Sequence, residues 1–179
     1  MKSLNNAAIP AAIARMLRTP PLEPHAFAAT KFHSAEDKAW FGNAFLKFLA
    51  ADCPQSAFTK RFYNRLSNSF GHIAHYNSAG FYEHFFVDLA GKIDFLQQTL
   101  QWPCYGQPEH TFSDVELVLQ ARLSTTNLLP LLIARRDADI ARRERELLAR
   151  LKAKYEPQPQ PYAAPTMALR QPSLFDLSA

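Results

Sequence analysis

The stretch Ser34-Ala-Glu-Asp-Lys-Ala-Trp-Phe-Gly-Asn-Ala-Phe-Leu-Lys-Phe-Leu49 sets the fold class of this 179-residue chain. Its serine suits a helix N-cap, and the two acidic residues that follow complement the positive end of a helix dipole. Apolar residues then recur every three to four positions, at Trp40, Phe41, Phe45, Phe48 and Leu49. This period predicts an amphipathic helix whose aromatic face is buried.

The sequence on the C-terminal side repeats the helical period. Pro54 is predicted to begin a helix with the stripe Phe58, Phe62, Leu66, Phe70 and Ile73. A turn and cap at 77–80 precede a further stripe, predicted to be one helix, of Phe81, Phe85, Leu89, Ile93, Leu96 and Leu100. Trp102-Pro103 is expected to end that helix, because proline has no backbone donor.

Three more helices are predicted at the two ends of this region. Residues 4–18 form a short helix with Ala7, Ala8, Ile13 and Leu17 on its inner side. Ser113-Asp-Val-Glu116 has the pattern of a capping box and starts another helix, which Pro130 is expected to kink or split. Residues 131–155 are helical but mostly charged. The chain is therefore predicted to be all-α, a compact bundle of five to seven helices.

The distribution of proline divides the chain into four parts. Residues 1–24 are an N-terminal helix and proline linker, and residues 25–156 are the helical domain. Residues 157–170 form a proline-rich tether that we expect to be disordered, because such sequence favours extended chain and cannot pack a core. Residues 171–179 form a short terminal peptide.

Cysteine usage and hydropathy indicate a cytoplasmic protein. Cys53 and Cys104 have no CxxC spacing, which supports neither a zinc site nor a disulfide framework. No apolar run is long enough for a transmembrane helix. Residues 1–22 carry basic residues and no acidic one, as a mitochondrial presequence does, but an N-terminal helix docked on the domain is the preferred interpretation.

The terminal peptide Gln171-Pro-Ser-Leu-Phe175 resembles the sliding-clamp-binding motif of bacterial replication and repair proteins, Gln-x-Ser/Asp-Leu-Phe. Gln171, Ser173, Leu174 and Phe175 match that motif, whereas Pro172 replaces the commoner aliphatic residue. The resemblance implies that Leu174 and Phe175 fill a hydrophobic pocket of the clamp and that Gln171 hydrogen-bonds at its rim. The alternative is that both apolar side chains pack on the protein's own surface.

A basic helix precedes the tether. Residues 134–154 hold four acidic and eight basic residues, the latter being Arg135, Arg136, Arg142, Arg143, Arg145, Arg150, Lys152 and Lys154. Such a helix is typical of proteins that contact the phosphates of duplex DNA. Asp139 and Glu146 precede arginines by four residues, however, which also suits a solvated or coiled-coil helix.

Three histidines are the candidate metal ligands. His72 and His75 are three residues apart and can share a helix face, and Glu83 and His84 follow. The spacing differs from that of known metalloprotease motifs, and histidines of this kind are more often structural. The sequence predicts neither a catalytic residue nor a cofactor.

Together these features predict a non-enzymatic accessory protein of DNA replication or repair, from a bacterium, plasmid or phage. Its partners would be the sliding clamp and duplex DNA, and no membrane is involved. Two alternatives stay open. One is a small metal-dependent enzyme using His72, His75 and His84, and the other is an inhibitor that binds a protein through an aromatic-rich surface.

Overall fold

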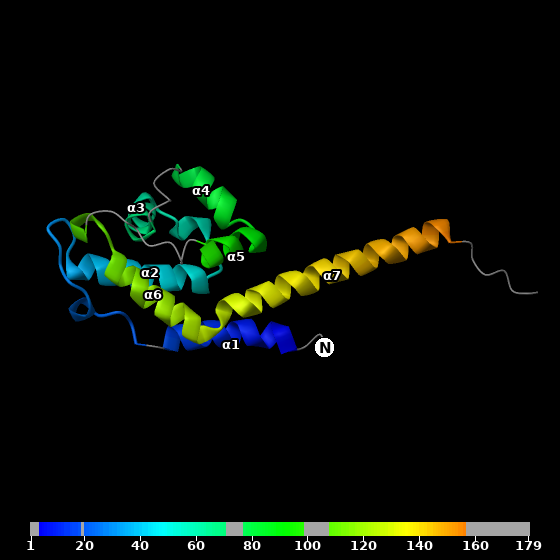
Figure 1. The fold of residues 1–179 in the computed structure, drawn as a ribbon, viewed down its shortest axis with the longest axis horizontal. Coiled ribbons are helices and arrows are strands. Elements are labelled where there is room, and N and C mark those ends of the chain that lie inside the picture. The colour runs from blue at the N-terminus through cyan, green and yellow to red at the C-terminus, as the bar shows by residue number, and fades with distance from the viewer. Residues whose placement is uncertain (1–3, 19, 71–76, 99–107, 157–179) are drawn as a thin grey trace, which may run out of the picture. The chain divides into compact units, whose positions relative to one another are not determined.

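The computed structural model describes residues 4–18, 20–70, 77–98 and 108–156, and within them it contains seven α-helices and no strand (Figure 1). The helices are α1 (Leu4–Arg18), α2 (Ala35–Ala50), α3 (Lys60–Ser69), α4 (Ser78–Phe85), α5 (Leu89–Gln98), α6 (Ser113–Thr126) and α7 (Leu128–Tyr155). The predicted all-α body is confirmed.

Contacts along the chain divide it into two compact units. The first, residues 1–141, holds α1 to α6 and the first half of α7. The second, residues 142–179, holds the remainder of α7.

Helix α2 is central to the first unit and contacts α1, α3 and α6 (Figure 1). Its predicted cap is confirmed, because Ser34 Oγ accepts a hydrogen bond from the Asp37 backbone N–H at 3.2 Å. Phe41, Phe45 and Phe48 are buried as expected. Trp40 was expected to be buried with them, but it is 37% exposed and lies under the Arg61 guanidinium, whose Cζ is 3.8 Å from the ring centroid.

The core of the first unit is built mainly from phenylalanine rings. Phe95 of α5 is fully buried, and its ring contacts phenylalanines of α2 and α4 and the phenylalanines that directly follow α3 and α4. These partners are Phe45, Phe70, Phe81, Phe85 and Phe86. Burying each such side chain contributes about 1.5–3 kcal/mol to folding. Most of the periodically spaced phenylalanines of the sequence therefore lie in the core of the first unit.

The helix expected to begin at Pro54 begins six residues later. Pro54 precedes a short 3₁₀ turn, Gln55–Ala57, and Thr59 caps α3 by accepting a hydrogen bond from the Phe62 backbone N–H at 3.2 Å. A hydroxyl cap defines the start of a helix better than a proline that adopts extended backbone. Phe62 and Leu66 are buried as predicted, but Phe58 is only half-buried.

The stripe expected to form one helix over 81–100 is divided between α4 and α5. Asp88 begins α5 by accepting a hydrogen bond from the Gly91 backbone N–H at 2.7 Å on its Oδ1. Gly91 makes this corner possible, since a Cβ there would overlap the His84 carbonyl oxygen and lie 3.0 Å from that of Phe85. The four-residue apolar period continues through the corner, so the periodicity alone could not reveal the break.

Helix α1 has the predicted bounds, and Ile13 packs against the core as expected, but the rest of its inner face differs from the prediction. Ala12 and Met16 are buried in the core, whereas Leu17, expected on the inner side, is 51% exposed, and Ala7 is also exposed. The helix packs against α2 and α6. In a helix this rich in alanine, the apolar residues do not single out one face, so the packing partners decide it.

The predicted capping box at Ser113–Glu116 is wrong. Phe112 is the N-cap residue of α6 and makes no side-chain cap bond. Its backbone N–H donates instead to the Asn68 carbonyl at 2.9 Å, while Glu116 is buried and accepts from Gln120 Nε2 at 3.0 Å. The Glu116 backbone N–H, which Ser113 would have capped, donates instead to the Phe112 carbonyl at 2.9 Å.

The predicted break near Pro130 occurs at Asn127. This residue has left-handed backbone (φ 55°), which asparagine tolerates better than most residues, and it ends α6. Pro130 lies in the first turn of α7, where no backbone donor is needed. Among the described helices, none alone is long and apolar enough to cross a membrane; α6 and α7 meet that test only as a pair bent by 57°.

Candidate functional site

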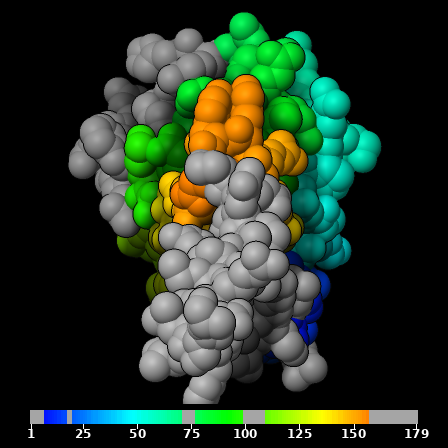
Figure 2. All heavy atoms as spheres, turned by 90° about the vertical axis from the view of Figure 1, so that its right-hand side faces the viewer, coloured from blue at the N-terminus to red at the C-terminus, as the bar shows by residue number. Residues whose placement is uncertain are grey.

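The C-terminal half of α7 carries most of the predicted DNA-binding residues on its surface. Every described residue from 142 to 156 is exposed, and the side chains of the last turns (orange) are visible in Figure 2. Six of these residues are basic: Arg142, Arg143, Arg145, Arg150, Lys152 and Lys154. Three are acidic, namely Glu144, Glu146 and Glu156, so this segment has a net charge of +3. Exposed charge of this sign attracts the phosphates of a nucleic acid.

The other two predicted DNA-binding residues have different surroundings. Arg136 pairs with its neighbour Asp137, whose Oδ1 lies 2.9 Å from Arg136 Nη2. Arg135 lines a cavity of about 230 Å³ whose wall also includes Lys92 and Cys53. Burial raises the pKa of the Cys53 thiol to about 12, so this thiol is protonated at neutral pH and is a poor nucleophile.

Apolar side chains share the exposed segment of α7 with the charges. Leu147 is 57% exposed, Leu148 53%, Leu151 45% and Tyr155 68%. Three leucines and a tyrosine at this exposure on about four turns of helix are more than a purely solvated helix needs. The segment therefore combines a basic surface with an apolar one.

The described residues give no support to a metal site. No group of three or more His, Cys, Asp or Glu side chains is close enough to hold a metal ion in this part of the chain. His84 is exposed on the last turn of α4, where its ring packs edge-on against Phe85 with centroids 4.4 Å apart. His72 and His75 lie outside the described residues.

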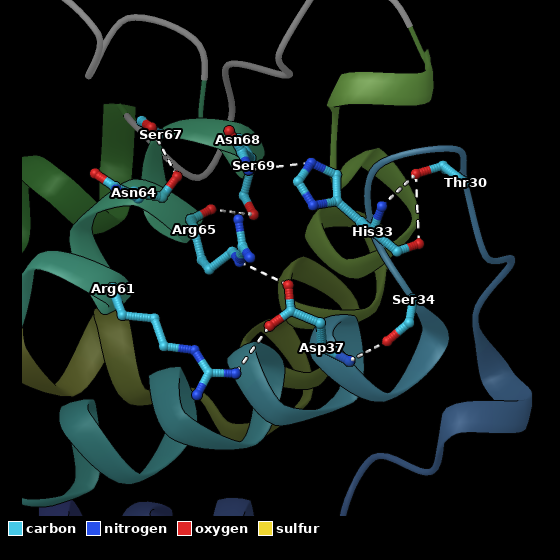
Figure 3. A network of polar contacts seen from close by, with 10 residues as sticks. All are labelled: Thr30, His33, Ser34, Asp37, Arg61, Asn64, Arg65, Ser67, Asn68 and Ser69. Atoms are coloured by element: carbon cyan, nitrogen blue, oxygen red, sulfur yellow. Dashed lines mark hydrogen bonds and ion pairs between the residues drawn. The ribbon is translucent and has the colours of Figure 1, made fainter.

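A polar cluster that the sequence did not predict joins α2 to α3 (Figure 3). Asp37 accepts a hydrogen bond from Arg61 Nη2 at 3.0 Å on Oδ1. Its Oδ2 lies 2.6 Å from Arg65 Nε, within ion-pair distance but off the line of a hydrogen bond. Asp37 was expected only to complement the helix dipole, and no local pattern shows that two arginines a turn apart on another helix converge on it.

His33 adjoins this cluster at the start of α2. Its Nε2 is 3.4 Å from Asn68 Nδ2, and its ring packs edge-on against Phe112 at 4.8 Å. Its Nδ1 is buried and has no hydrogen-bond partner among the described residues. Burial lowers the pKa of His33 below its ordinary value of 6.5, and the positive charge of Arg65 lowers it further. His33 is thus held neutral near pH 7.

An ion pair with a buried lysine and a partly exposed aspartate connects α2 to the first turn of α6. Lys38 is buried, and its Nζ donates to Asp114 Oδ2 at 2.8 Å and to the Ala28 carbonyl at 2.7 Å. A buried cation of this kind must keep its partners, because removing one leaves an uncompensated charge. Together with the Asp37 cluster, this pair connects α2 to both α3 and α6. Neither arrangement presents a nucleophile activated by an adjacent base.

A second cavity, of about 580 Å³, lies where α5, α6 and α7 meet. Its wall is mainly apolar, with Leu96, Leu123, Leu128, Leu129 and Pro130, and Gln120, Ser124 and Asn127 are its polar members. A space of this size and character suits a small apolar molecule. Its polar side chains do not form a catalytic arrangement.

The predicted clamp-binding residues Gln171, Ser173, Leu174 and Phe175, and the tether 157–170, lie outside the described residues. Comparison with known proteins identifies no relative: no family model, curated protein or solved structure matches this chain.

Proposed function

We propose that this protein is a non-enzymatic accessory factor of bacterial DNA replication or repair, which binds the sliding clamp through its C-terminal peptide. It is encoded by a bacterium, a plasmid or a phage. The observation that carries the proposal is the sequence Gln171-Pro-Ser-Leu-Phe175, placed after a proline-rich stretch. In this arrangement Leu174 and Phe175 enter the clamp's pocket, and Gln171 bonds at the rim.

The magnitude of the apolar contact supports a moderate affinity. Full burial of Leu174 and Phe175 contributes about 1.5–3 kcal/mol for each side chain. Ordering the peptide offsets part of this gain, so a dissociation constant on the order of micromolar is expected. Pro172 reduces the ordering cost if its restricted backbone matches the bound conformation.

The exposed basic segment of α7 supplies the second contact in this proposal. It contributes a sequence-independent attraction to duplex DNA, because phosphate contacts carry no base information. A clamp encircling DNA would hold this segment at high local concentration near the duplex, so strong intrinsic DNA affinity is unnecessary.

The proposal is tested by titrating purified bacterial sliding clamp with the full-length protein. We expect Leu174→Ala/Phe175→Ala to weaken binding by at least about 100-fold, since both anchor side chains are lost. The matched control is Leu169→Ala, which removes an apolar residue of the tail outside the motif and should leave the affinity unchanged. Binding that survives the double substitution, or no binding by the wild-type protein, would overturn the proposal.

A further inference from the structure

The exposed apolar residues of α7 form one continuous stripe. Leu151 follows Leu147 by four residues and Leu148 by three, and Tyr155 follows after four more, so all four lie on one side of the helix. Glu144 lies one turn before this stripe, and Lys154 lies on the same side at its other end. The stripe is therefore apolar in the middle, acidic at one end and basic at the other.

The stripe is complementary to the same stripe on a second copy of the helix that runs in the opposite direction. If a second copy of the helix lies antiparallel and Leu147 is opposite Leu151 of the second copy, then Leu151 is opposite Leu147. The same register brings Glu144 opposite Lys154 at both ends of the contact. The four layers span about 15 Å at the helical rise of 1.5 Å per residue.

A parallel pairing of the same helices is much poorer. In register, it would place Glu144 opposite Glu144 and Lys154 opposite Lys154, so like charges would meet at both ends of the leucine layers. Like charges across a helical interface are destabilising, and polar residues at such positions set helix orientation. Charge complementarity therefore selects the antiparallel arrangement.

The flanks of the antiparallel pair differ from each other. One edge carries Leu148 and Tyr155 of both copies, which extends the apolar contact. The other edge carries Arg143 and Arg150 of both copies, whose mutual repulsion weakens the pair. Glu146 lies within one turn of each of these arginines on its own helix and reduces the repulsion.

We propose that this protein self-associates through residues 144–155 of α7 as an antiparallel pair of helices. The interface is smaller than that of most stable dimers, so the association is weak, with a dissociation constant above about 10 µM. The arginine edges of the two copies come together on one side and form a longer basic surface. The self-association does not depend on the proposed clamp function.

Sedimentation equilibrium on the full-length protein, from micromolar to millimolar concentration, tests the register by charge reversal. Glu144→Lys and Lys154→Glu each replace two attractive pairs by two repulsive ones, and each should weaken the association about tenfold. Glu144→Lys/Lys154→Glu restores opposite charges and should return the dissociation constant to within about threefold of wild type. All three variants alter exposed residues and leave the first unit unchanged.

The orientation is tested separately by cross-linking. Leu148→Cys in a Cys104→Ser background should form a disulfide between two copies, because this edge position meets its equivalent only in the antiparallel pair. Arg142→Cys, on the outer side of the helix, is the matched control and should not cross-link. A wild-type protein that stays monomeric at millimolar concentration, or a double reversal as weak as the single ones, would overturn the proposal.

Discussion

His33 shows how strongly the surroundings determine the behaviour of one residue. From the sequence it is a histidine in a linker, and it entered no predicted site. In the structure, charged and titratable groups of three elements face it, namely Asp37 and Lys38 of α2, Arg65 of α3 and His110 of the 3₁₀ turn Pro108–His110. Three of these groups oppose a positive charge on the ring, and Asp37 favours it.

This environment predicts a loss of stability in acid. Because the pKa of His33 is lowered on folding, the unfolded chain binds a proton more readily, so the free energy of unfolding decreases as pH falls below 6.5. The effect is expected to be below about 1 kcal/mol, since the ring is partly exposed and water screens its charge. Urea denaturation of wild type and His33→Gln at pH 7.5 and 5.5 measures it.

The matched control is His84→Gln, which removes an exposed histidine on α4. We expect it to keep the acid sensitivity of the wild type, whereas His33→Gln should lose part of it. An equal change in stability for all three proteins between the two pH values would contradict the role of His33.

At the scale of the element, the corner between α4 and α5 depends on one residue without a side chain. An alanine inside an exposed helix is normally more stable than glycine by about 1 kcal/mol. At Gly91 we expect glycine to be more stable than alanine. The added Cβ would meet the carbonyl oxygens of His84 and Phe85, which are backbone atoms and cannot rotate away.

We therefore expect Gly91→Ala to lower the free energy of unfolding by about 1–3 kcal/mol, as overpacking does. Gly80→Ala is the control. A Cβ there would lie 3.2 Å from Asn77 Oδ1, a side-chain atom that can adjust, so stability should change by less than about 1 kcal/mol. Thermal and chemical denaturation compare the two. A Gly91→Ala variant as stable as the wild type would show that the corner has more freedom than its backbone contacts suggest.

At the scale of the molecule, the charges of α7 sum to +4, which equals the net charge of the whole chain, and its C-terminal half, residues 142–155, carries all of this excess. The proposed DNA contact therefore belongs to α7. Replacing Arg142, Arg143 and Arg145 by glutamine should reduce the slope of log affinity against log salt for duplex DNA. The loss of affinity should be similar for unrelated DNA sequences, because the arginines would contact phosphates and not bases.

Fluorescence anisotropy across a range of salt concentrations measures this slope. The control is Lys31→Gln/Lys47→Gln/Lys60→Gln, which removes the same charge from exposed positions elsewhere on the chain. An equal effect of the two triple variants would mean that net charge, not α7, governs the attraction. If the wild-type protein does not bind duplex DNA even at low salt, then α7 is a solvated helix and the proposed DNA contact is wrong.

The sequence by itself determined the helical fold class, the Ser34 cap and much of the aromatic core. These features depend on local periodicity and on hydrogen bonds within one turn, both of which are readable from neighbouring residues. Phe41, Phe45, Phe48 and Phe62 were correctly assigned to the interior for this reason. The exposed basic residues of α7 follow equally from composition.

Only the tertiary structure decided where the helices stop and which polar groups meet. The apolar period continues from Phe81 to Leu96 although the chain turns at Asp88. Asp37 binds Arg61 and Arg65, and Lys38 binds Asp114, across sequence separations that no local pattern records. The physical reason is that the apolar period of a helix determines which of its faces is buried, whereas the packing of the whole core determines which helix covers that face. Long-range pairs such as Lys38–Asp114 therefore exist only once the core has formed.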